Sequence, residues 1–113
     1  MKRQIVIASS LTALAFAALA AGPRTQKFTG VITDSMCARA NHSQMQMGAN
    51  DAECAVACVL AHGAEYVLFD GMHAYTLSDQ KAPEKFAAKK VIVVGTLDAN
   101  THAIKVLSIV PAK

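Results

Sequence analysis

Two runs rich in β-branched residues near the C-terminus constrain the fold of this chain most strongly. They cover residues 90–97 (KVIVVGTL) and 102–110 (HAIKVLSIV), and both are typical of β-strands. Residues 98–101 (DANT) between them have the composition of a turn, and Pro111 is expected to end the second strand. The C-terminal third is therefore predicted to form two consecutive strands.

Three shorter segments are also predicted to be strands. They are residues 27–33 (KFTGVIT), 65–69 (EYVLF) and 73–77 (HAYTL), and the last two flank Asp70-Gly71, a strong hairpin signal. A helix is expected over 51–62, because Asn50 can cap it with Glu53 three residues on and Gly63 can end it. Residues 80–88, which include Pro83, predict a short second helix.

Five strands with a helix between the third and the fourth is the order of an OB-type barrel. The predicted fold is therefore mainly β (α+β), a small five-stranded OB-like barrel. A helical insertion that carries all the cysteines, residues 34–64, separates strands one and two. A five-stranded sandwich or roll would explain the same segments. Gly30 and Gly95, each inside a strand, suit the tight bends of a small barrel.

The N-terminus has the pattern of an export signal. Lys2 and Arg3 precede a long apolar run, and Ala18-Leu19-Ala20 supplies the small-x-small pattern of a cleavage site. We expect a signal peptide over residues 1–20, a leader over 21–26 and a single domain over 27–113, with a periplasmic or secreted location. An uncleaved anchor is the alternative. No other stretch approaches the length of a transmembrane helix, so no stable membrane span is expected after cleavage.

The charge balance argues against a nucleic-acid partner. The formal net charge is +3, from 11 basic and 8 acidic residues. Without Lys2 and Arg3, 9 basic residues face the same 8 acidic ones, so the domain carries only +1. No glycine-rich phosphate loop, paired-carboxylate motif or nucleophile–base arrangement is recognisable, so the sequence does not predict an enzyme.

All three cysteines fall in the insertion, at Cys37, Cys54 and Cys58. On a helical wheel of residues 51–62, an apolar stripe is formed by Ala52, Ala55, Val56, Val59 and Leu60. We expect this stripe to pack on the sheet, which would leave Cys54, Cys58 and His62 in an outward row. The loop upstream carries the side chains that match this row, namely Cys37, His42, Met45 and Met47.

One interpretation of these residues is a metal site. Cys37, His42, Cys54 and Cys58 make a three-sulfur, one-nitrogen set suited to tetrahedral Zn²⁺. Met45 and Met47 would instead favour Cu⁺, which prefers thioether and thiolate donors, and His62 is a further candidate ligand. The function predicted on this interpretation is an exported domain that binds copper or zinc.

The other interpretation is a disulfide. Cys37 would bond to Cys54 or Cys58, since cysteines one helical turn apart are poorly placed to bond each other. The protein would then be a stapled structural or interaction module that binds a partner in the cell envelope. One thiol remains unpaired in this case, which leaves both a monomer and a disulfide-linked dimer open.

A series of short motifs resembles a family of small exported bacterial proteins of unknown function with an OB-like domain. The motifs are TGVITDSMC, EC-x3-CV, GA-x-YVL-x-DG, LSDQ and KKVIVVGTLD, and they span nearly all of residues 27–110. The resemblance implies a cleaved signal and a barrel, and it implies no activity. Cys37, Cys54 and Cys58 match the positions of the DS-x-C and C-x3-C motifs.

Overall fold

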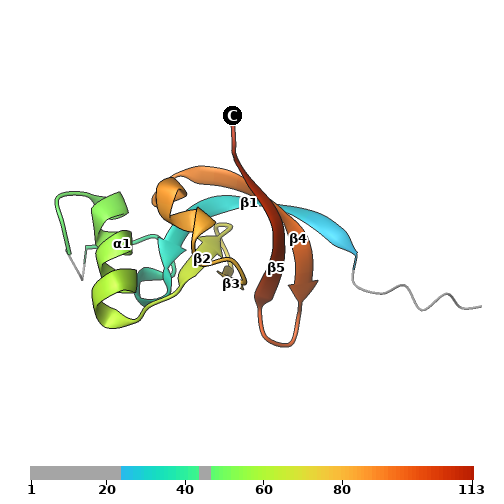
Figure 1. Cartoon of the computed structure of the whole chain (residues 1–113), viewed down its shortest axis with the longest axis horizontal. Coiled ribbons are helices and arrows are strands. Elements are labelled where there is room, and N and C mark those ends of the chain that lie inside the picture. Colours follow the sequence, from blue (N-terminus) through green and yellow to red (C-terminus); the bar gives the residue numbers. More distant parts are fainter. Residues whose placement is uncertain (1–23, 44–46) are drawn as a thin grey trace, which may run out of the picture.

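Five strands close into a small barrel in the computed structural model, which describes residues 24–43 and 47–113 (Figure 1). Around the barrel the strands follow the order β1-β2-β3-β5-β4, and β4 pairs with β1 to close it. Among these five strands, β3 and β5 pair in parallel and the other neighbours pair antiparallel. The predicted OB-like barrel is therefore confirmed. The strands are β1 (Thr25–Asp34), β2 (Tyr66–Phe69), β3 (Ala74–Leu77), β4 (Lys90–Asp98) and β5 (Ala103–Pro111).

The strands form where alternating apolar residues can fill the interior of the barrel. On β4, Val91 and Val93 are buried while their neighbours are more exposed, which is the period of a strand with one buried face. The register of β4 and β5 shifts between Val94 and Gly95, where the strands bend. The main core consists of Ile32, Tyr66, Leu68, Leu77, Val91, Val93 and Ile104.

The long helix α1 (Asp51–His62) lies between β1 and β2 in the chain and to one side of the barrel (Figure 1). Its predicted caps are confirmed. The Asn50 side chain accepts a hydrogen bond from the Glu53 N–H, and Gly63 ends the helix in the left-handed conformation at φ 68°. The predicted second helix is the short 3₁₀ helix η2 (Ala82–Phe86), and a further 3₁₀ turn, η1 (Ser35–Cys37), follows β1.

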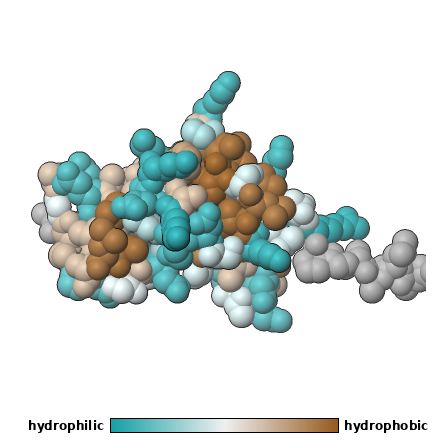
Figure 2. All heavy atoms as spheres, viewed as in Figure 1, coloured by the Kyte–Doolittle hydropathy of each residue, from teal (hydrophilic) through white to brown (hydrophobic). Residues whose placement is uncertain are grey.

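The predicted orientation of α1 is wrong. Leu60 of the expected buried stripe is 73% exposed, whereas Cys54 and Cys58 of the expected outward row are 2% and 0% exposed. Hydrophobic residues are accordingly visible on the surface over α1 in Figure 2. The helix is rotated by roughly a third of a turn from the expected position, at about 100° per residue. A thiol behaves as a small hydrophobic group, and the cysteine face with Ala55 lets the helix approach the barrel closely.

At the N-terminus β1 begins earlier than expected. Thr25 and Gln26 of the predicted leader pair with Thr96 and Gly95 of β4, so they belong to the barrel. The predicted signal peptide, residues 1–20, lies outside the described residues. None of the helices in the described ranges combines the length and the hydropathy that crossing a bilayer requires.

Two glycines are required where strands approach closely. A Cβ atom on Gly30 would overlap the carbonyl oxygen of Phe69, and one on Gly95 would overlap that of Lys105. We expect Gly30→Ala and Gly95→Ala each to lower the free energy of unfolding by about 1–3 kcal/mol, because the backbone must move to admit the methyl group. Urea denaturation measures this. Thr29→Ala at an exposed position of β1 is the control, and glycine variants as stable as this control would contradict the prediction.

Candidate metal centre

The position of Cys37 is set by a buried carboxylate at the end of β1. Asp34 is fully buried, and its Oδ1 accepts hydrogen bonds from the backbone N–H groups of Met36 (2.9 Å) and Cys37 (3.0 Å). These bonds cap the turn η1 and orient Cys37 toward the interior. The Ser35 N–H donates to the Glu65 carbonyl, and the Glu65 N–H donates to the Ser35 hydroxyl, so the turn is also tied to the residue before β2.

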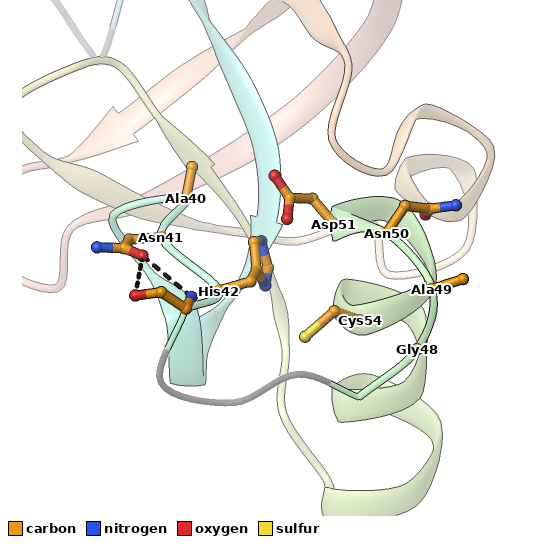
Figure 3. Close-up of a pocket in the computed structure, with 9 residues that line it drawn as sticks. Ala40, Asn41, His42, Gly48, Ala49, Asn50, Asp51 and Cys54 are labelled. Atoms are coloured by element: carbon orange, nitrogen blue, oxygen red, sulfur yellow. Dashed lines mark hydrogen bonds between the residues drawn. The ribbon is translucent and has the colours of Figure 1, made fainter.

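Cys37, His42 and Cys54 form a compact buried cluster. One sulfur or ring nitrogen from each lies within 4.8 Å of the other two. The three side chains come from the turn η1, the loop after it and helix α1, and Figure 3 shows His42 and Cys54 converging from the last two. Donor atoms around a tetrahedral zinc ion lie about 3.3–3.8 Å apart, as follows from the usual ligand distances. A small inward movement of these side chains would therefore surround one ion.

The hydrogen bonds around His42 leave one ring nitrogen available. The Thr33 hydroxyl donates its single proton to the Cys37 carbonyl at 3.0 Å, so it can only accept from His42 Nε2, which lies 3.3 Å away. The Nε2 atom therefore carries a proton. Nδ1 is buried, has no hydrogen-bond partner among the described residues, and lies 3.8 Å from Asp34 Oδ2. In the neutral ring Nδ1 holds a lone pair suited to a metal ion.

Cys58 lies next to the cluster but does not complete it. Its thiol is in hydrogen-bond contact with Cys54, one helical turn away. Among the described residues, however, only Cys37, His42 and Cys54 have donor atoms that all lie within 4.8 Å of one another. All three cysteines are thiols here rather than disulfides. Cys58 packs with Ala64 and with the partly buried side chains of Met47 and Val59.

Burial favours the protonated form of two of the buried thiols, Cys37 and Cys58. The pKa of Cys58 is raised to about 11, mainly by burial and in smaller part by the charge of Asp34 and by the neighbouring thiols. The pKa of Cys37 is also raised, first by burial and then by the charge of Asp34. A metal ion that binds here must therefore displace thiol protons, which is the usual coupling for thiolate ligands.

The remaining predicted ligands fall in different places. Met47 is partly buried against the cysteines, and its backbone N–H donates to Cys54 Sγ at 3.4 Å. His62 is exposed at the end of α1, outside the cluster. Met45 lies outside the described residues. Thr33 and Asp34 support the site and were not predicted, although an aspartate directly before a turn is a capping signal.

A pocket of about 480 Å³ lies over the cluster (Figure 3). His42 and Cys54 reach its wall, whereas Cys37 does not. Most of the other lining residues are polar or small, and they are Ala40, Asn41, Ser43, Gly48, Ala49, Asn50 and Asp51. The cluster is therefore buried in protein on one side and reachable through a polar pocket on the other.

Comparison of the chain with family models, with curated proteins and with solved structures found no match. The resemblance to small exported proteins therefore stays a prediction. The function has to be argued from the geometry and chemistry of the cluster itself.

The role of Thr33 is testable with a substitution of nearly the same shape. Thr33→Val would leave the Cys37 carbonyl and His42 Nε2 without this buried hydrogen-bond partner. We expect the free energy of unfolding to fall by about 1–3 kcal/mol, the cost of unsatisfied buried polar groups. Thr29→Val, exposed on the same strand, is the matched control and should change stability by less than about 0.5 kcal/mol. Equal effects of the two variants would contradict the assignment.

Proposed function

We propose that this protein binds one soft metal ion, Zn²⁺ or Cu⁺, through Cys37, His42 and Cys54. The observation that carries the proposal is the mutual distance of 4.8 Å or less among three buried donor atoms from three separate segments. Thiolate and imidazole are the donors that zinc prefers, and thiolates also suit Cu⁺. No catalytic reaction is part of the proposal.

Two buried polar atoms support a cation at this position. Asp34 Oδ2 and His42 Nδ1 are both buried without a hydrogen-bond partner in the described part of the chain, and they lie 3.8 Å apart. Native proteins rarely leave such atoms unsatisfied, because each costs about 1–3 kcal/mol. A metal ion bound to Nδ1 would satisfy the imidazole directly and would place a positive charge beside the carboxylate.

Two further residues would act as an outer shell around the ion. The Thr33 hydroxyl accepts from Nε2 and so leaves Nδ1 for the metal, and Asp34 holds the turn that carries Cys37. Metal-bound histidines commonly have their other ring nitrogen fixed by such a hydrogen bond. Met47 and Cys58 pack beside Cys54, so further sulfur-containing side chains border the three donors.

We also propose that the domain works outside the cytoplasm. The support is the basic start, apolar run and small-residue end of residues 1–20 and the resemblance to small exported proteins. In an oxidising compartment a metal ion would protect the buried thiols, because thiolates bound to a metal are not available for disulfide formation.

A disulfide-stapled module is the second candidate, and one contact favours it. The Cys37 thiol is in hydrogen-bond contact with Cys54, so these sulfur atoms are already neighbours. A bond between them would close a loop of about 17 residues and stabilise the fold by about 3 kcal/mol. Cys58 would then be left as a single thiol, in a monomer or a disulfide-linked dimer. Such a module would bind an envelope partner through another surface.

Metal binding is tested by native mass spectrometry of the purified protein after loading with Zn²⁺ or with Cu⁺. We expect a mass increment of one ion, and we expect Cys54→Ser and His42→Gln to abolish it because each removes a donor atom. His62→Gln is the matched control and should retain the ion, since His62 is exposed outside the cluster. Absence of the increment in the wild-type protein under reducing conditions would overturn the proposal.

The stapled alternative gives a different result under oxidising conditions. It predicts that a reductant and Cys37→Ser each lower the free energy of unfolding by about 3 kcal/mol, while a chelator has no effect. Metal binding predicts that a chelator destabilises the loaded protein and that a reductant does not. Alkylation after unfolding without a reductant then counts one reactive thiol for the disulfide form and three for the metal form.

A further inference from the structure

The three-residue cluster is open toward the pocket on one side. His42 and Cys54 contribute to the pocket wall, and the third donor, Cys37, lies beneath them without reaching it. An ion held by these three side chains would therefore have protein on the Cys37 side and the pocket of about 480 Å³ on the other.

Cys58 does not occupy the open side. It follows Cys54 by one turn of α1, is completely buried, and packs against Ala64 rather than lining the pocket. Its sulfur contacts Cys54, but it does not lie within 4.8 Å of all three donor atoms. Within residues 24–43 and 47–113, three side chains offer donor atoms to one ion in this arrangement, and a fourth position remains.

We infer that the metal ion held by Cys37, His42 and Cys54 keeps a fourth coordination position that faces this pocket and takes a neutral donor from outside the chain. The donor class is water or a nitrogen base such as an imidazole or an amine. The inference rests on the proposed function. Zinc sites with four protein ligands are closed and structural, whereas sites with three protein ligands bind an exchangeable molecule in the fourth position.

The charges around the cluster favour a neutral donor over an anion. Two cysteine thiolates balance the charge of a divalent ion, so the buried carboxylate of Asp34 adds a net negative charge. Asp51 lines the pocket itself and adds another (Figure 3). An incoming anion would meet like charge on both sides of the ion. A donor that carries an N–H or O–H group could instead donate a hydrogen bond to Asp51.

The polar groups on the pocket wall are consistent with this assignment. The Asn41 side-chain oxygen already accepts from both the backbone N–H and the hydroxyl of Ser43. The Asn50 side-chain oxygen accepts from the Glu53 N–H as the cap of α1. Asp51 is the charged group of the pocket lining, so it is the residue expected to select the donor.

The test uses the full protein loaded with Co²⁺, which accepts tetrahedral sites like zinc and reports its ligands in the visible spectrum. Imidazole and azide are titrated in parallel. We expect imidazole to shift the visible bands to saturation, with an affinity at least about tenfold above that of azide. Asp51→Asn should reduce this preference several-fold. Glu84→Gln, which removes an exposed carboxylate outside the pocket lining, should leave the preference unchanged.

Cys58→Ala distinguishes the open site from a closed one. We expect this variant to retain Co²⁺ and the response to imidazole. If wild-type protein binds Co²⁺ but ignores imidazole, the fourth position is closed and the inference is overturned while metal binding stands. A response that appears only in Cys58→Ala would identify Cys58 as the closing ligand. If wild-type protein binds no Co²⁺, Zn²⁺ or Cu⁺, both proposals fall. The wild-type titration decides the question even if the variant does not fold.

Discussion

The buried carboxylate of Asp34 is the constraint on which the cysteine cluster depends. Its backbone belongs to the last pair of the β1–β2 ladder, opposite Tyr66, so its position is fixed by the barrel. Its Oδ1 caps the turn that carries Cys37, and its Oδ2 faces His42. A carboxylate removed from water is costly unless hydrogen bonds or a positive charge compensate it. Two backbone N–H groups supply part of that compensation, and the remaining oxygen is directed at the position where a cation would bind.

The cluster is at the same time the packing contact between α1 and the rest of the molecule. The large aliphatic side chain of Leu60 is exposed, so the helix is not held by a conventional apolar stripe. Its fully buried face consists of Cys54, Ala55 and Cys58, which are small enough for close approach. Donor atoms from the turn, the loop and the helix therefore meet because these thiols also serve as the core of the insertion.

The sequence predicts the features of this fold that depend on neighbouring residues. Strand periods, the Asp70-Gly71 hairpin and the caps at Asn50 and Gly63 are local signals, and each is found where it was expected. The face of α1 is not a local property. A helical wheel that counts thiols as polar predicts that the cysteines face outward. This prediction fails because buried thiols behave as small hydrophobic groups. The support from Thr33 could not be predicted either, because the Cys37 carbonyl and His42 Nε2 are brought to its hydroxyl only by the path of the turn and loop after β1.

The sequence shows which residue types could bind a metal ion, but it does not show that three of the candidates, Cys37, His42 and Cys54, come together while Cys58 stays apart. Cys54 and Cys58 are equivalent by spacing, and only the docking angle of α1 places Cys54 beside His42 and Cys58 behind it. That same angle leaves Cys54 on the wall of the pocket and Cys58 sealed in the interior. If the proposed metal site exists, the packing of the small residues on α1 is what would separate an exchangeable metal position from a purely structural one.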